Sequence, residues 1–153
     1  MKKIDLGQTI AILANVGVIA GIVFLGFELR QNQLVGRAHS RNELSRAKEE
    51  LTMVDLSNSI ERILRVRSGD EFSEEERVTL NGWASLWLNF FENVHYQYRM
   101  RLLDEDEFEA EMRELRRGLN GRGPMKSAFC SRRDRLSPSF VVEVESRLEA
   151  PCV

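Results

Sequence analysis

The pattern in this chain that comes closest to a catalytic or metal-binding motif is one Glu-x-x-His pair, Glu92 and His95. Two such pairs, together with two further glutamates, hold di-iron centres inside helical bundles. The other histidine, His39, has Glu43 four residues later and does not repeat the spacing. Half of such a motif does not predict a metal site. Glu92 and His95 are therefore candidate ligands only, and the alternative is a polar residue and a histidine at the rim of a core.

Other signatures of enzymes and nucleotide-binding proteins are missing from the sequence. There is no G-x-S-x-G nucleophile elbow. There is also no G-x-x-x-x-G-K-[ST] phosphate loop and no G-x-G-x-x-G fingerprint. Gly121 and Gly123 lie between predicted helices, with no strand before them, so we interpret them as part of a turn. We therefore expect no catalytic residues and no cofactor, and an enzymatic role is not favoured.

Glu92 and His95 would be positioned by a long helix that we predict from about Ser73 to Leu102. Ser73 and Glu76 have the spacing of a capping box, in which each side chain bonds the backbone N–H of the other residue. The apolar face of this helix is broad enough for the centre of a core, and its aromatic residues are more typical of a core than of a ligand pocket. The face comprises Leu80, Trp83, Ala84, Leu86, Trp87, Phe90, Phe91, Val94 and Tyr98.

Further helices are predicted on both sides of this one. A short helix is expected over about residues 57–67, and another over residues 104–119, ended by Asn120 and Gly121. A short helix should begin at Pro124, and a last one at Ser137 and Pro138. The predicted fold class is all-α: a single N-terminal transmembrane helix that continues into a small helical domain of about four to five further helices.

The membrane segment is predicted over residues 9–27, which contain fourteen apolar side chains and no charge. A helix of this length spans about 28 Å, close to the hydrocarbon thickness of a bilayer. A cleaved signal peptide would need a shorter apolar region and a small-residue cleavage site, and a buried helix usually has a polar stripe. We expect an uncleaved anchor that continues as one helix to about residue 53. Residues 1–28 would form the tail and anchor, 29–150 the helical domain, and 151–153 a frayed tail.

Basic residues on the two sides of the membrane segment bear on its orientation. Lys2 and Lys3 precede it, whereas Arg30, Arg37, Arg41 and Arg46 follow within 20 residues. The flank of a membrane helix with more basic residues usually lies on the cytoplasmic side. The expected localisation is therefore the cell inner membrane, single-pass, with a cytoplasmic C-terminal domain.

One contact motif lies within the membrane segment. Gly17 and Gly21 form a G-x-x-x-G pair, which lets two helix backbones approach closely, and Asn15 nearby can hydrogen-bond across such a contact. The pair predicts a dimer or a docking face for another membrane helix. The alternative is chance, because glycine is common in membrane helices.

Charge is segregated along the helical domain, although the whole chain carries a net charge of only −2. Residues 70–111 contain twelve acids and three arginines, a net of −9. Residues 113–135 have a net of +6, and this basic stretch could rest on anionic lipid or pair with the acidic stretch. No nucleic-acid partner is expected. The basic residues are Arg113, Arg116, Arg117, Arg122, Lys126, Arg132, Arg133 and Arg135.

The two cysteines, Cys130 and Cys152, belong to no C-x-x-C motif and no ligand array. We expect two reduced thiols. The alternative, a disulfide between them, would place the domain in an oxidising compartment.

Three segments together resemble a group of small bacterial membrane proteins of uncharacterised function. The first is Leu25-Gly-Phe-Glu-Leu-Arg-Gln-Asn32, which directly follows the apolar helix. The others are the aromatic helix Asn89-Phe-Phe-Glu-Asn-Val-His-Tyr-Gln-Tyr98, leading into Leu102–Phe108, and the terminal Leu136-Ser-Pro-Ser-Phe140. Relatives should have tryptophans after the Gly-Pro turn, where this chain has none. The resemblance implies an anchor followed by helices, and it implies no activity.

These patterns favour a non-enzymatic interaction or scaffold module anchored in the bacterial inner membrane. Its partners would be the lipid bilayer, a second copy of itself, or another membrane protein. The alternative function is a small-molecule- or metal-binding sensor or enzyme with a pocket in the helical domain.

Overall fold

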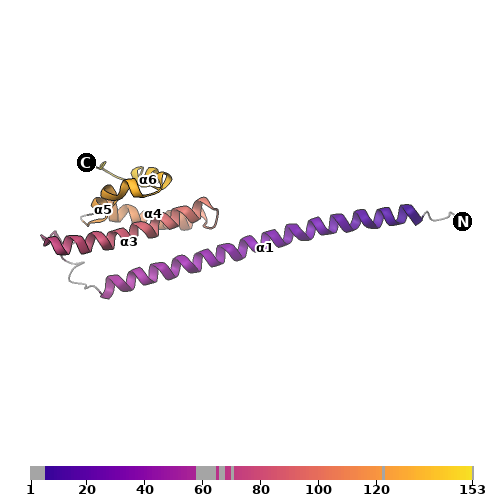
Figure 1. The fold of residues 1–153 in the computed structure, drawn as a ribbon, viewed down its shortest axis with the longest axis horizontal. Coiled ribbons are helices and arrows are strands. Elements are labelled where there is room, and N and C mark those ends of the chain that lie inside the picture. Colours follow the sequence, from indigo (N-terminus) through magenta and orange to yellow (C-terminus); the bar gives the residue numbers. More distant parts are fainter. Residues whose placement is uncertain (1–5, 58–64, 66–67, 70, 122, 153) are drawn as a thin grey trace. The chain divides into compact units, whose positions relative to one another are not determined.

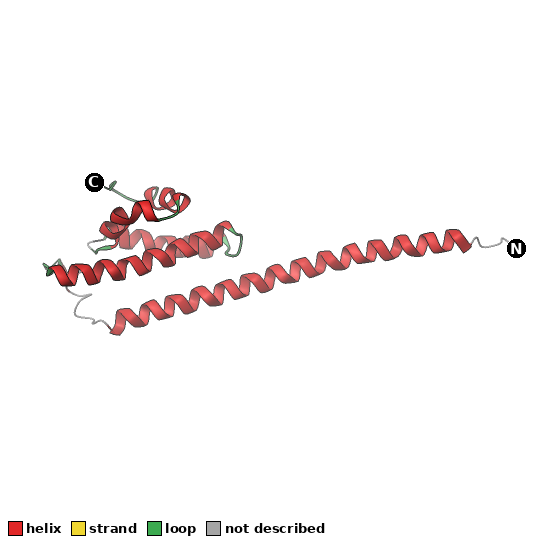
Figure 2. Cartoon of the chain, viewed as in Figure 1, coloured by secondary structure: helices red, strands yellow, loops and turns green. Residues whose placement is uncertain are grey.

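Figure 1 shows the computed structural model of the chain, which describes residues 6–57, 65, 68–69, 71–121 and 123–152. All regular elements in these ranges are helical, as the colouring of Figure 2 shows, and the predicted all-α class is confirmed to that extent. Contacts divide the chain into two compact units, Met1–Ala38 and His39–Val153. The helices are α1 Leu6–Ser57, α3 Glu74–Arg99, α4 Glu105–Leu119, α5 Met125–Arg132, the 3-10 turn η1 Arg133–Arg135, and α6 Pro138–Glu145.

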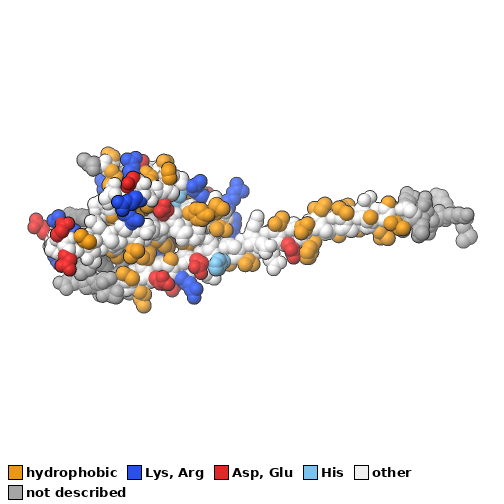
Figure 3. Space-filling view, viewed as in Figure 1, with side chains coloured by type: hydrophobic (Ala, Val, Ile, Leu, Met, Phe, Trp, Pro, Cys, Tyr) orange, Lys and Arg blue, Asp and Glu red, His pale blue; other side chains and the backbone are white. Residues whose placement is uncertain are grey.

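Helix α1 is 52 residues long and ends four residues beyond the predicted position. No proline interrupts it. Among the described residues it contains one segment long and apolar enough to cross a membrane. Its large apolar side chains from Ile10 to Phe27 are between 53% and 67% exposed, whereas those of a soluble core helix would be buried. Apolar side chains line much of this exposed segment in Figure 3.

Helix α3 begins with the predicted capping box. The Glu76 N–H donates to the Ser73 hydroxyl at 3.3 Å, and the Ser73 N–H donates to the Glu76 carboxylate at 2.9 Å. The Arg65 guanidinium lies 2.6 Å from the same carboxylate. The hydrogen bond from Ser73, followed by that from Arg65, lowers the pKa of Glu76. The sequence signal is local, because the cap is completed within one helical turn.

The later helices differ from the prediction in their details. Pro124 caps α5 instead of standing in its first turn, while Pro138 does occupy the first turn of α6. Helix α6 ends at Glu145, so Leu148 packs against the core from beyond the helix. The turn η1 was not predicted. The short helix predicted over residues 57–67 falls mainly on 58–64 and 66–67, which lie outside the described residues.

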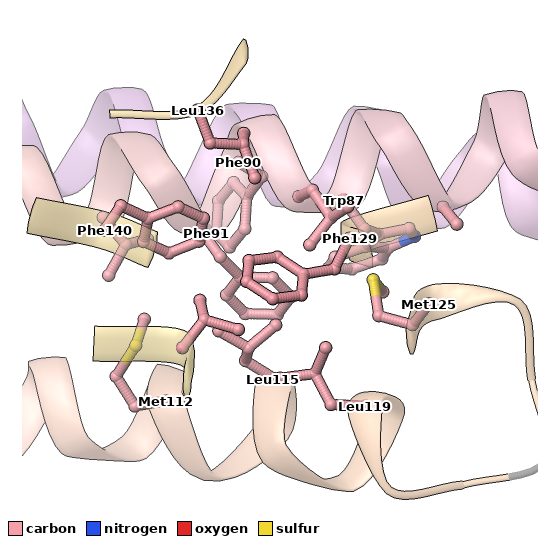
Figure 4. Packing of buried hydrophobic residues seen from close by; sticks show 14 of the residues in the cluster. Trp87, Phe90, Phe91, Met112, Leu115, Leu119, Met125, Phe129, Leu136 and Phe140 are labelled. Atoms are coloured by element: carbon pink, nitrogen blue, oxygen red, sulfur yellow. The ribbon is translucent and has the colours of Figure 1, made fainter. Parts of the chain in front are cut away.

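Aromatic and aliphatic side chains of α3, α4, α5 and α6 form most of the core of the second unit. Helix α3 packs against α4, α5 and α6. Figure 4 shows Phe91 of α3 and Phe129 of α5 in the middle of the cluster, with Met112, Leu115 and Leu119 rising from α4. All five are at most 1% exposed.

The predicted broad face of α3 needs one correction. Leu86 is 47% exposed and does not widen the core, although Phe90 and Trp87 do. Tyr98, at the other end of the face, stacks on Phe108 with ring centroids 4.0 Å apart. The Trp87 indole N–H is buried without a hydrogen-bond partner among the described residues. The aromatic residues of α3 are thus mainly packing groups.

The part of α1 in the second unit contributes one face to this core. Leu44 is buried, and Ala47 and Leu51 pack against the cluster, as their spacing predicts. Ser40 and Gln97 form a buried hydrogen bond between α1 and α3. The Lys48 ammonium lies 2.8 Å from both Glu111 and Glu114 of α4.

Candidate functional site

The Glu92 side chain is committed to a structural hydrogen bond. Its Oε1 accepts from the backbone N–H of Ser137 at 2.6 Å. Ser137 is the residue that precedes α6, so a carboxylate of α3 satisfies a donor at the positive end of another helix. This contact ties the start of α6 to the middle of α3.

The His95 ring lies one turn further along α3 and has a different environment. It is 6% exposed, with ring centroids 6.2 Å from Phe108 and 5.7 Å from Phe140. Burial lowers the pKa of His95 below its usual 6.5, and the Arg99 charge adds to this effect. The carboxylates of Glu143 and Glu92 act in the opposite direction but do not cancel it. At neutral pH the imidazole is therefore mainly uncharged.

Glu92 and His95 do not form the start of a larger ligand set in the described part of the chain. No group of three or more His, Cys, Asp or Glu side chains there could hold a metal ion. The arrangement around the pair provides a hydrogen-bonded helix junction and an aromatic packing site.

The ion-pair cluster around Arg147 was not predicted from the sequence. Arg147, just beyond α6, lies 2.7 Å from the Glu109 carboxylate and donates from Nε to Glu143 at 2.7 Å. These hydrogen bonds raise the pKa of Arg147 despite its burial, and the bond from Arg147 lowers the pKa of Glu109. The guanidinium also lies 5.8 Å from the centre of the Phe108 ring. Because Glu109 and Arg147 are 38 residues apart, no local pattern could have paired them.

The basic stretch is spread over α4, α5 and η1, and Arg122 lies outside the described residues. Arg113, Arg116 and Arg117 project from α4 and are exposed. On α5, Lys126 and Arg132 are half-buried, and Arg132 donates to Asn89 at 3.3 Å. In η1, Arg133 and Arg135 are exposed, and Arg133 pairs with Glu145 at 2.5 Å.

Acidic residues of the 70–111 stretch find cations elsewhere in the chain. Glu76 pairs with Arg65, Glu107 with Arg41 at 3.2 Å, Glu109 with Arg147 and Glu111 with Lys48. None of these four cations belongs to the basic stretch. The two segregated stretches are therefore not each other's main ion-pair partners in these contacts.

The three predicted contact residues in the membrane segment do not share one face of α1. A helix turns about 100° per residue, so Asn15 lies about 200° around the axis from Gly17 and about 120° from Gly21. All three are exposed, and a methyl group added at either glycine would meet nothing within 4 Å. On the continuous helix the Asn15 side chain therefore points away from the Gly17 contact, and the contact of Gly17 and Gly21 with another helix stays a prediction.

The expectation of two reduced cysteines is wrong. Cys130 of α5 and Cys152 form a disulfide, with Cα atoms 5.5 Å apart. Both residues pack against the core, so the segment before Val153 is held in place and the predicted fraying does not extend to Cys152. The 22-residue separation hid this pairing, because it depends on how η1 and α6 fold back.

One hollow lies between the start of α3 and the α4–α5 connection. Its volume is about 270 Å³, and none of the described residues that line it is a predicted site residue. It is lined by Phe72, Arg77, Leu80, Asn81, Gly123, Pro124 and Ser127.

Comparison with known proteins does not assign this chain to a family. No family model, curated protein or solved structure matches this chain.

Proposed function

We propose that this chain is a single-pass protein of the bacterial inner membrane whose helical domain acts by interaction and not by catalysis. The observation that carries the proposal is the exposed apolar segment of α1. From Ile10 to Phe27 its large apolar side chains are all more than half exposed within the chain. Burying one such side chain contributes roughly 1.5–3 kcal/mol, so the segment needs an apolar medium around it. A bilayer supplies that medium, and a helix satisfies its own backbone hydrogen bonds there.

The use of polar residues inside the domain supports a non-enzymatic role. Glu92 is bonded to Ser137, and Arg147 is paired with Glu109 and Glu143. These contacts lock helices together. The resemblance to small bacterial membrane proteins supports the choice of the inner membrane. The proposed partners are the lipid bilayer and either a second copy of the chain or another membrane protein. The exposed arginines of α4 are available to anionic lipid.

The disulfide favours an orientation opposite to the one expected from the arginine count. Disulfides persist in oxidising compartments and are rare in the cytosol. Cys130 and Cys152 therefore support a domain in the periplasm, with Lys2 and Lys3 on the cytoplasmic side. The four arginines after the membrane segment oppose this orientation. Arg41 among them is already paired with Glu107.

The anchor is tested by alkaline carbonate extraction of membranes that contain the full chain. The protein should stay with the membrane pellet. Val18→Arg should release much of it, because a charge at the centre of a membrane helix costs about 2.5–3.5 kcal/mol. Val142→Arg is the matched control, since Val142 is 67% exposed on α6. A native chain that extracts completely would refute the anchor.

Interaction is tested by chemical crosslinking and affinity purification in mild detergent. We expect a homo-oligomer or a partner membrane protein that is recovered in constant proportion. A strictly monomeric chain with no co-purifying protein would contradict the proposal.

Orientation is tested by protease treatment of spheroplasts together with a thiol assay. An alkylating reagent first blocks the free thiols of the denatured protein, without reductant. The disulfide is then reduced, and a heavy maleimide labels the thiols that the reduction releases. A periplasmic domain should be cleaved from outside and should gain two heavy adducts. A protected domain whose thiols are alkylated in the first step would support the cytoplasmic orientation instead.

The alternative function is a small-molecule- or metal-binding sensor or enzyme, and the 270 Å³ hollow is the observation that favours it. Elemental analysis of the purified chain and a thermal-shift panel with His95→Ala would test it. Absence of metal and unchanged melting across the panel would exclude this alternative.

A further inference from the structure

Asn15 is the one carboxamide in the membrane segment, at residues 9–27. It lies three residues from the middle of that segment, or about 4.5 Å along the helix axis. The Asn15 side chain is exposed, and no described residue of the chain hydrogen-bonds to it. If the proposed function holds, this amide lies in hydrocarbon. An amide there is unfavourable without a hydrogen-bond partner, so a partner outside the chain is needed.

The helix face around Asn15 is uncharged and shaped for close contact. At about 100° per residue, six other residues between positions 9 and 33 of α1 lie within about 40° of Asn15. Gly26 is among them, and nothing lies within 4 Å of the position a methyl group would take there, so another backbone can approach. Arg30, the charged residue nearest to the face between positions 9 and 33, lies about 60° from its centre, and Arg37 lies about 40° from the centre one turn beyond Gln33. We call these residues the Asn15 face: Ala11, Asn15, Ile19, Ile22, Gly26, Leu29 and Gln33.

We propose that the Asn15 face binds a second copy of this chain in a parallel helix pair. Two copies inserted in the same direction are necessarily parallel, and their Asn15 side chains lie at the same depth. A carboxamide donates through nitrogen and accepts through oxygen, so two copies are complementary across a two-fold axis. Any other partner would need its own polar group at that depth. A single asparagine in a helix seam sets parallel pairing and register in coiled coils in the same way.

The Asn15 face continues beyond the apolar segment. Leu29 is 64% exposed, although it lies after Glu28 and outside the hydrocarbon-length segment. Gln33 lies on the same line as Asn15, five full turns further along. In a parallel pair each Leu29 covers the other, and each Gln33 amide meets a second amide. A second copy therefore accounts for polar and apolar members of the face together.

The Gly17 and Gly21 pair predicts a different contact. Gly17 lies about 200° from Asn15, so a helix packed on the Gly17 face leaves the amide in lipid. The two contacts are mutually exclusive in one dimer, and this makes the proposal testable residue by residue.

Cysteine crosslinking in native membranes distinguishes the two faces. Single cysteines are introduced into the full chain, whose own two cysteines are already joined. Mild oxidation should yield a disulfide-linked dimer with Ile19→Cys and Ile22→Cys. Gly17→Cys and Phe24→Cys, about 180–200° from Asn15, should stay monomeric. Crosslinking at Gly17 and Phe24, or equally at all four positions, would overturn the proposal.

Substitution of Asn15 supplies the energetic test. Energy transfer between labelled full-length copies in phospholipid vesicles measures the dimer equilibrium. Asn15→Leu should weaken association by about 3- to 20-fold, the usual range for one hydrogen bond between membrane helices. Asn15→Gln should restore part of it, and Gly17→Leu should change nothing. Unchanged association in Asn15→Leu would refute the Asn15 contact.

The inference rests on the proposed membrane anchor, and carbonate extraction separates the two. A chain that remains in the membrane but shows no energy transfer refutes the self-pairing and leaves the anchored interaction module standing. A chain that extracts from the membrane refutes both.

Discussion

Glu92 on α3 and the backbone N–H of Ser137 before α6 are joined by a 2.6 Å hydrogen bond across 45 residues of sequence. A negative charge at the first turn of a helix also interacts favourably with the helix dipole. The residue that the sequence singles out as a candidate metal ligand is thus a helix-capping group supplied from another helix. This relationship makes α6 depend on α3 for its start.

Removal of the Glu92 carboxylate should destabilise the helical domain. Glu92→Ala leaves a half-buried donor without its partner and removes a charge-assisted bond, so we expect a loss of about 1–3 kcal/mol in the free energy of unfolding. Glu92→Gln keeps an acceptor and should lose less. Thermal and denaturant unfolding of the full chain in micelles measures both. Glu75→Ala, exposed on the same helix, is the control and should stay within about 0.5 kcal/mol.

His95 should make the domain less stable in mildly acidic solution. Its pKa in the folded state lies below the 6.5 of the unfolded chain. As the pH falls, the unfolded state therefore binds the proton first. The stability that depends on His95 is fully present above about pH 6.5 and is lost as the pH drops towards the folded pKa. The loss is at most about 1.4 kcal/mol per pH unit.

The comparison of native protein with His95→Gln isolates this effect, because glutamine does not titrate. The variant should lose the pH dependence just below 6.5. It should keep the further loss of stability below pH 4.5, the normal pKa of a glutamate. There the unfolded chain binds protons at Glu109 and Glu76 before the folded protein does, because folding lowers the pKa of both residues. Parallel stability curves for the two proteins across pH 5–7 would contradict the assignment.

The Cys130–Cys152 bond should contribute substantially to stability. Closing a loop of 22 residues restricts the unfolded chain by about 3 kcal/mol in the chain-entropy account. The double variant Cys130→Ser/Cys152→Ser should unfold at correspondingly lower denaturant concentration, while Ser131→Ala should not. If adding reductant to the native protein leaves its unfolding midpoint unchanged, the bond has no stabilising role.

Phe91 and Leu86 should respond very differently to truncation, although both were predicted in one apolar face. Phe91 is 1% exposed, so Phe91→Ala should cost about 3–5 kcal/mol. Leu86 is 47% exposed, and Leu86→Ala should fall within about 0.5 kcal/mol of the native protein. Unfolding midpoints at equal protein concentration provide the comparison. A large loss with Leu86→Ala would mean that another surface covers it.

The sequence by itself determined several helix boundaries and the apolar segment. The capping box at Ser73 and Glu76, the stop after Leu119 and the start at Pro138 each depend on residues within about one helical turn. These helix ends form without a partner from another part of the fold. The same is true of the spacing of Leu44, Ala47 and Leu51, which marks one face of α1 wherever that helix packs.

Only the tertiary structure decided what the polar and sulfur-containing residues do. Glu92 meets Ser137, Arg147 meets Glu109, and Cys130 meets Cys152, across 45, 38 and 22 residues. Such pairs form because particular helix faces are brought together, and composition and periodicity do not specify which faces meet. Leu86 differs from Phe91 for the same reason, since a broad apolar face is covered only where another helix reaches it.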